Sequence, residues 1–129
     1  MKFPEGIKYT TDHEWVRLDG DVVTIGVTDF AQDALGDVVY VDLPDVGDTL
    51  AAGDTVAEIE SVKAVSDIFS PVSGEVVAVN EDLDGAEEAV NEDPYGAGWL
   101  FQVRLSDMGE LDGMMDIEGY KAFVAEQDA

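Results

Sequence analysis

The chain is organised around the stretch Glu58-Ile59-Glu60-Ser61-Val62-Lys63-Ala64-Val65-Ser66-Asp67-Ile68-Phe69-Ser70-Pro71. Residues 55–60 and 65–69 are short β-prone runs, and such runs separated by a few small or polar residues predict a β-hairpin. Lys63 would then lie at or beside the exposed tip. It is the only cation between Arg17 and Arg104, in a segment of 86 residues that contains 20 acids. A lysine kept where nearly all others are missing indicates a chemical role.

The composition excludes several kinds of active site. The 129 residues include no cysteine and a single histidine, His13. Disulfides, thiolate metal sites, cysteine nucleophiles and multi-histidine metal centres are therefore excluded or disfavoured. Asp82, Asp84 and Glu87 come nearest to an oxygen-ligand loop, but their spacing does not match one, and we expect no metal site.

The net charge of the chain disfavours two classes of partner. The formal net charge of −24 disfavours binding to nucleic acid and to anionic lipid. It indicates salt adaptation, an acidic face for basic partners, or both. No apolar run is long enough to span a membrane, and residues 1–6 lack the apolar core of a signal peptide. We therefore expect a cytoplasmic protein.

The N-terminal part predicts a hairpin and a short helix. Two apolar-patterned runs flank Asp19-Gly20-Asp21, which is typical of a hairpin turn. Residues 28–36 begin with Thr28, a good N-cap, and end with Gly36, a helix stop signal. This segment predicts a short helix.

The remaining segments predict further strands and a helical end. Residues 37–43 alternate, which places Val39, Val41 and Leu43 on one side of a strand. Residues 75–80 and 99–105 also predict strands, and the acid-rich segment 81–93 predicts a solvated loop with one helical turn. From Ser106 onward the apolar residues recur at helical spacing, with glycines between them, which predicts two short helices.

The lysine hairpin carries a family resemblance. Glu60-Ser61-Val62-Lys63-Ala64, with Gly47 and Gly53 upstream and 70–76 downstream, resembles the lipoyl-attachment signature. The rest of the chain, from about Ile7 to Tyr120, resembles the H protein of the glycine cleavage system. The supporting stretches are Tyr9, His13-Glu14-Trp15-Val16, Ile25-Gly26-Val27-Thr28-Asp29, Ala31-Gln32, Leu35-Gly36-Asp37-Val38-Val39, Leu43-Pro44, Asn91 with Pro94-Tyr95, and Gly98-Trp99.

The resemblance implies a fold. We expect a mainly β protein, with a lipoyl-domain-like hybrid sandwich or barrel of two antiparallel sheets. A short helix near 29–35 and C-terminal helices would complete it. The whole chain, 1–129, would be a single lipoyl-carrier domain, with a lipoyl-like core at about 20–105 and a helical cover at about 106–127.

The resemblance also implies a carrier rather than an enzyme. Lipoic acid would be joined to Lys63 by an amide, at a site that a lipoylating enzyme recognises through Glu60, Ser61, Val62 and Ala64. The other partners would be a pyridoxal-phosphate glycine decarboxylase, a tetrahydrofolate-dependent aminomethyltransferase and a flavin dihydrolipoamide dehydrogenase. The protein would position the arm, and the cofactor sulfur would supply the chemistry.

Two carboxylates match the family pattern for a cleft that shelters the aminomethyl group. Glu14 and Asp67 would hold its amine through charge-assisted hydrogen bonds. We therefore expect Glu14→Ala to speed the loss of formaldehyde and ammonia from the loaded arm. The sequence departs from the family at Asp12, where relatives often have a small hydroxylic residue, and at Phe30 and Ala34, where some have histidine.

Other functions share these sequence features. A lipoate-relay protein, which hands octanoyl or lipoyl groups to other acceptors, would have the same pattern. A lipoyl domain of a 2-oxoacid dehydrogenase would share the hairpin but usually precedes a flexible linker. A biotin carrier would have methionines where Val62 and Ala64 stand. An unmodified acidic binding module, in which Lys63 is only a solvated turn residue, is the alternative from another class.

Overall fold

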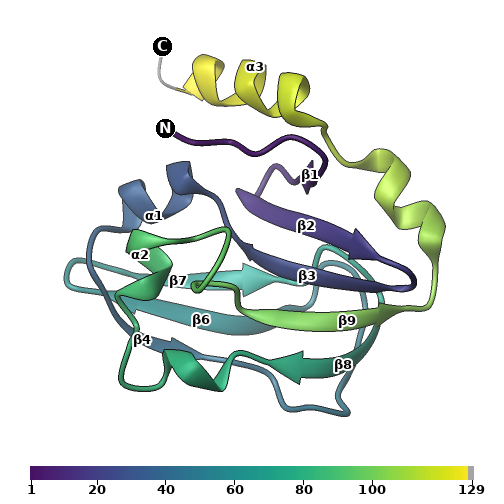
Figure 1. Ribbon diagram of the computed structural model, residues 1–129, viewed down its shortest axis with the longest axis horizontal. Helices are drawn as coiled ribbons and strands as arrows, with labels where there is room; N and C mark the ends of the chain where they lie inside the picture. The colour runs from purple at the N-terminus through teal and green to yellow at the C-terminus, as the bar shows by residue number, and fades with distance from the viewer. Residues whose placement is uncertain (128–129) are drawn as a thin grey trace.

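The backbone forms two antiparallel sheets, and the computed structural model describes residues 1–127 (Figure 1). The strands are β1 (Lys8–Tyr9), β2 (Glu14–Asp19), β3 (Val22–Val27), β4 (Val38–Asp42), β5 (Thr49–Leu50), β6 (Thr55–Ser61), β7 (Val65–Phe69), β8 (Gly74–Val79) and β9 (Phe101–Leu105). The helices are α1 (Asp29–Leu35), α2 (Ala89–Glu92) and α3 (Ile117–Gln127), with 3-10 turns η1 (Glu81–Leu83) and η2 (Met108–Gly113). One sheet has the order β1-β2-β3-β9-β8-β5 and the other β4-β6-β7. The predicted fold class, mainly β with two antiparallel sheets, is confirmed.

Both predicted hairpins are present, and their tips lie at opposite ends of the molecule (Figure 1). Strands β6 and β7 pair antiparallel, with Glu60 opposite Val65, so Lys63 lies in the connection and is exposed. Strands β2 and β3 pair with Asp19 opposite Val22, which leaves Gly20 and Asp21 as a two-residue turn.

The short helix α1 is confirmed with the expected caps. The side chain of Thr28 accepts a hydrogen bond from the main-chain N–H of Ala31 at 3.2 Å. Gly36 ends the helix with a φ of 80°, a conformation that glycine adopts without strain. The chain then turns directly into β4, which brings α1 beside the lysine hairpin.

The predicted sidedness of β4 is wrong at its first residues. Val38 is buried and Val39 is exposed, whereas the alternation had placed Val39 on the same side as Val41 and Leu43. The cause is a register shift between Val38 and Tyr40 in the pairing with β6. A bulge inserts one unpaired residue and reverses the facing of everything before it.

Two apolar clusters hold the fold together. The larger cluster lies between the sheets and includes Ile25, Ile59 and Phe101. The acid-rich segment forms two helical turns, η1 and α2, one more than predicted. Each turn places one apolar side chain in this cluster, Leu83 from η1 and Val90 from α2.

The second cluster joins the C-terminal helix to the N-terminal segment. The ring of Tyr9 stacks on Tyr120 of α3 with centroids 4.6 Å apart. The two predicted C-terminal helices are thus present as η2 and α3, and Gly119 does not interrupt α3. Among residues 1–127, none of the helices combines the length and the apolar character that a membrane span requires.

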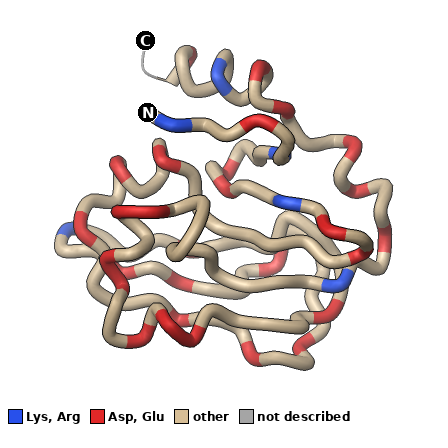
Figure 2. The backbone as a smooth tube through the Cα atoms, viewed as in Figure 1, with Lys and Arg blue, Asp and Glu red and all other residues tan. Residues whose placement is uncertain are grey.

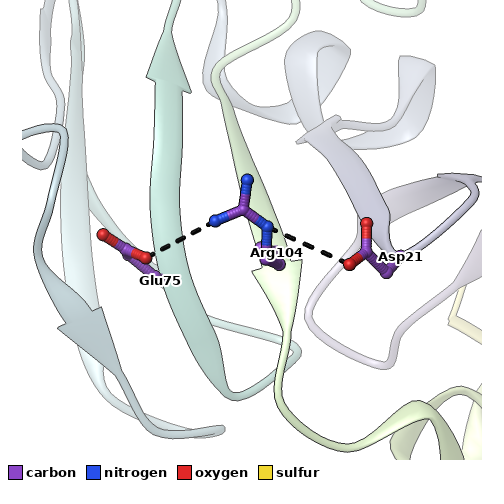
Figure 3. A network of polar contacts seen from close by, with 3 residues as sticks. All are labelled: Asp21, Glu75 and Arg104. Carbon is purple, nitrogen blue, oxygen red and sulfur yellow. Dashed lines mark ion pairs between the residues drawn. The ribbon is translucent and has the colours of Figure 1, made fainter.

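Acidic residues are distributed over the whole molecule, and basic residues are few (Figure 2). At the β2–β3 end, Arg104 of β9 lies between Asp21 and Glu75 (Figure 3). Its Nε lies 3.9 Å from Asp21 Oδ2, and its Nη1 lies 3.7 Å from Glu75 Oε1. All three side chains are exposed, so each pair contributes at most about 1 kcal/mol to stability.

Candidate functional site

The tip that carries Lys63 is shaped by one buried hydroxyl. The Oγ of Ser61 accepts hydrogen bonds from the main-chain N–H groups of Lys63 at 3.3 Å and Ala64 at 3.1 Å. It also lies 3.2 Å from the carbonyl oxygen of Ala64, to which it donates. These contacts use the full bonding capacity of a hydroxyl. The main chain of the tip is therefore held, while the side chains of Val62 and Val65 remain 69% and 56% exposed.

The side chain of Lys63 lies over the end of α1. A Cβ atom built on Gly36 would be 3.2 Å from Cε and 3.8 Å from Nζ of the lysine. The glycine thus leaves room for the lysine and also provides the positive φ that ends α1. Asn91 holds this corner, because its Nδ2 donates to the Gly36 carbonyl and its Oδ1 accepts from the Val38 N–H, both at 2.8 Å.

A cleft of about 300 Å³ begins beside the lysine. Helix α1 and strand β7 form its two long walls, and the cleft is lined by Asp12, His13, Val27, Ala31, Ala34, Leu35, Ala64, Val65, Ser66, Asp67 and Ile68. Ala64 is next to Lys63, and Asp67 is three residues farther along, roughly 10 Å in an extended strand. The cleft beside Lys63 is thus lined mostly by apolar side chains, with Asp12 and Asp67 among them.

The structure places the two predicted carboxylates differently. Asp67 lines the cleft and is exposed, whereas Glu14 is 1% exposed and does not line it. The Oε2 of Glu14 accepts a hydrogen bond from the Phe69 N–H at 3.1 Å, and its Oε1 accepts from the Thr10 hydroxyl at 3.4 Å. Glu14 therefore ties β2 to the end of β7, beneath the wall that carries Asp67.

The environment of Glu14 favours its neutral form. Burial and the negative charge of Asp12 raise the pKa of Glu14 to about 8, against the opposing effect of the Phe69 N–H and the Thr10 hydroxyl. Desolvation disfavours a charged carboxylate, and a nearby like charge adds to that effect. At neutral pH this side chain is mostly protonated.

His13 connects the cleft to the C-terminal helix. Its φ is 63°, which is unusual outside glycine. Its Nδ1 lies 2.8 Å from the Tyr120 hydroxyl, which in turn lies 2.6 Å from Oγ1 of Thr28. The His13 ring also packs on the ring of Phe30, with centroids 4.7 Å apart. Burial lowers the pKa of His13, and a hydrogen bond to Gln127 and the charge of Asp12 partly offset this effect.

Sequence reasoning missed several supporting residues of this site. Tyr120 is 107 positions from His13, so no local pattern links them. The sequence presents Gly36 as a helix stop and as part of the family pattern, and Asn91 as part of that pattern alone, but it does not indicate that both hold the corner under Lys63. Of the three predicted departures from the family pattern, Asp12 and Ala34 line the cleft, whereas Phe30 does not line it and packs against His13. Within residues 1–127, no three acids or histidines are grouped so that they could hold a metal ion.

Known proteins are similar to this chain over nearly its whole length. The family model described as glycine cleavage H-protein matches residues 7–127. The chain belongs to this family. It is 57% identical over 126 residues to the glycine cleavage system H protein of Aeromonas salmonicida, with 96% of this chain and 97% of that protein covered. It is 58% identical over 119 residues to that of Micrococcus luteus, with 91% and 93% covered.

A solved structure agrees with the fold. The crystal structure of a glycine cleavage system H protein from Mycobacterium marinum matches with a TM-score of 0.85 and 36% sequence identity. The match covers 98% of this chain and 100% of that one. The family resemblance inferred from the lysine hairpin is confirmed, and with it a place among carrier proteins.

Proposed function

We propose that this protein is the lipoyl carrier of the glycine cleavage system and that lipoic acid is joined by an amide to Nζ of Lys63. The observation that carries the proposal is the position of Lys63. It lies exposed on a tip whose main chain is held by Ser61, at the head of a cleft that can receive the attached arm. A modified lysine must be accessible to several enzymes and also be presented in one geometry to the enzyme that modifies it.

The tip provides that geometry to a lipoylating enzyme. The residues that flank the lysine, Glu60, Ser61, Val62 and Ala64, are the proposed recognition elements. Val62 offers an exposed apolar contact, and Ser61 fixes the backbone on both sides of the lysine.

The chain itself supplies position rather than catalysis. When bound, the lipoyl group would supply a disulfide that accepts the aminomethyl group of glycine and becomes a dithiol once that group is passed on. The proposed partners are the pyridoxal-phosphate glycine decarboxylase, the tetrahydrofolate-dependent aminomethyltransferase and the flavin dihydrolipoamide dehydrogenase. A cytoplasmic location and a single domain over residues 1–129 stay predictions of the sequence.

The cleft would shelter the arm between visits to these enzymes. Its lining is mostly apolar, Asp67 offers an acceptor on the β7 wall, and Glu14 holds that wall to β2. The cleft is therefore in a position to receive a lipoyl group joined to Lys63, because Ala64, the next residue, lines it.

Modification of the purified protein tests the proposal. After incubation with lipoic acid, ATP and a lipoylating enzyme, peptide mass spectrometry should find one lipoyl increment at Lys63. Lys63→Arg keeps the charge and should remain unmodified, while the control Lys121→Arg should be modified like the parent. A bare Lys63 throughout, or a lipoyl increment on another lysine instead, would contradict the proposal.

A further inference from the structure

A second cleft, of about 250 Å³, lies at the free edge of the smaller sheet. Strand β4 is the edge strand of the order β4-β6-β7, and none of the described residues that line this cleft belongs to β6 or β7. Tyr40, Val41 and Leu43 form one wall. The other wall comes from the segment between Val79 and Glu87, which lies beside β4 in Figure 1. The cleft is therefore on the side of β4 that has no neighbouring strand.

The main chain of β4 is unpaired on this side. Alternate residues of an edge strand direct their N–H and C=O groups away from the sheet. Among residues 1–127, β4 makes one main-chain hydrogen bond besides its pairing with β6, from the Val38 N–H to Oδ1 of Asn91 at 2.8 Å. The edge from Tyr40 to Asp42 is thus open to a further strand, and such edges bind extended segments of other chains.

The cleft has an apolar floor and a fixed far wall. Leu83 is a member of the larger apolar cluster, and Val79 packs against that cluster. The side chain of Asn80, which is 3% exposed, donates from Nδ2 to the carbonyl oxygens of Ala97 and Trp99, both at 2.8 Å. These contacts hold the far wall, so the cleft is present before anything binds.

The charges of the cleft all have one sign. Its charged lining residues are Glu81, Asp84 and Glu87. Within the part of the chain that the structure describes, none of these carboxylates takes part in an ion pair. A second copy of this chain would place the same acids against them, which disfavours a dimer through this surface. The cleft is complementary to an apolar side chain with positive charges around it.

The cleft is continuous with the tip that carries Lys63. Tyr40 lies opposite Glu60, three residues before the lysine, and Val38 lies opposite Ser61. Between the cleft and the tip, the exposed apolar side chains are Tyr40 at 52%, Val39 at 47% and Val62 at 69%. Contiguous exposed apolar surface on a soluble protein marks interaction sites. A partner bound in the cleft would thus lie beside the residue that carries the arm.

We propose that this cleft is a docking groove for an extended basic segment of a partner protein. The segment pairs with the free edge of β4, places an apolar side chain on the floor of the cleft, and sets lysines or arginines against Glu81, Asp84 and Glu87. It anchors a partner that acts on the arm of Lys63, and in this purpose the inference rests on the proposed function. The binding itself does not require the arm.

Titration of the full, unmodified, isotope-labelled protein with the peptide acetyl-Arg-Val-Arg-Leu-Arg-Val-Arg-amide tests the groove. In an extended strand its apolar side chains share one face. At about 0.15 M salt, which screens long-range attraction, we expect saturable binding with a Kd below about 1 mM. The amide resonances of β4 and η1 should shift most, and hydrogen exchange of β4 should slow. The same residues in the order Arg-Arg-Val-Leu-Val-Arg-Arg should bind about tenfold more weakly, because their apolar side chains no longer share a face.

Two double variants separate the groove from the general negative charge. Glu81→Gln/Asp84→Asn removes two acids from the lining and should weaken binding of the first peptide about fivefold, as expected for two partly exposed ion pairs. Asp82→Asn/Glu88→Gln is the matched control. It removes the same charge from exposed positions of the same segment that do not line the cleft, so its Kd should equal that of the parent.

The groove is overturned if the first peptide does not saturate, if both peptides bind equally well, or if the two double variants bind alike. Unchanged hydrogen exchange of β4 in the bound state would overturn the pairing with its edge. Failure of Lys63 to accept a lipoyl group would instead refute the proposed function, and the peptide titration does not depend on that reaction.

Discussion

The two hairpin tips at opposite ends of the molecule are built in different ways. At the β2–β3 tip, Gly20 has a φ of 67°, so the turn is made by the conformational freedom of the main chain. At the β6–β7 tip, the side chain of Ser61 bonds the N–H groups of Lys63 and Ala64. One turn depends on the lack of a side chain, and the other depends on the presence of one.

The two tips differ in what they do: the β2–β3 tip only joins two strands, whereas the β6–β7 tip also presents a residue. The β2–β3 tip ends in Asp21, whose carboxylate pairs with Arg104 and so stays close to its own sheet. The β6–β7 tip directs Lys63 away from its own strands, over Gly36 at the end of α1. A hydroxyl beneath the turn fixes the backbone without occupying the surface, which remains free for an enzyme.

The first prediction moves the lysine from one tip to the other. In Lys63→Arg/Asp21→Lys, the lysine stands on an exposed hairpin turn at the wrong end of the protein. We expect no lipoyl increment on this variant, because the β2–β3 tip lacks the flanking Glu60 and Val62 and lies away from the cleft between α1 and β7. Intact-mass measurement after treatment with the lipoylating enzyme gives the result.

Asp21→Lys in the parent background is the control for this exchange. It should be lipoylated once, at Lys63, with the unfolding midpoint changed by only a few degrees, since one exposed ion pair is lost. Lipoylation at position 21 of the double variant would show that any exposed turn lysine is a substrate, and it would contradict a special role for the β6–β7 tip.

The local parts of this structure were predictable from the sequence. The two hairpins, the capped helix α1 and the exposed position of Lys63 follow from turn residues and patterns within a few positions of each other. The facing of Val39 was not predictable, because a bulge interrupts the alternation without changing the residue types. Strands β1 and β5 have two residues each, too few for any pattern.

The site was predictable at its centre and not in its surroundings. The residues around Lys63 are contiguous, so the motif identifies them directly. Nothing local distinguishes Glu14 from the other acids, because its burial depends on Phe69 of β7, 55 positions away. The same holds for the cleft, whose walls come from a helix and a strand that meet only in the folded chain.

The second prediction concerns Glu14, which links the two hairpins. Folding raises its pKa from 4.5 to about 8, so its protonated form favours the fold fully below about pH 4.5, and this contribution is lost as the pH rises toward 8. Between pH 5 and 8.5 we expect the parent protein to lose on the order of 3 kcal/mol of unfolding free energy that Glu14→Gln does not lose.

Urea unfolding at constant ionic strength across this pH range measures the difference. Glu58→Gln is the control, because Glu58 is an exposed acid of β6 and its curve should run parallel to that of the parent. If the Glu14→Gln curve is also parallel to the parent, Glu14 is ionised in the folded protein and the link between the hairpins is a charged one.

The third prediction, with the smallest expected effect, compares one substitution in each tip. Gly20→Ala places a side chain at a φ of 67°, and Ser61→Ala removes the hydroxyl that bonds Lys63 and Ala64; each should lower the unfolding free energy by about 1 kcal/mol. Only Ser61→Ala should slow lipoylation of Lys63, several-fold, because it loosens the geometry that the enzyme must engage. The two variants are matched in stability, so their lipoylation rates can be compared directly. Equal rates would mean that an exposed lysine is sufficient. A lower rate in Ser61→Ala alone would assign the presentation of Lys63 to the buried hydroxyl.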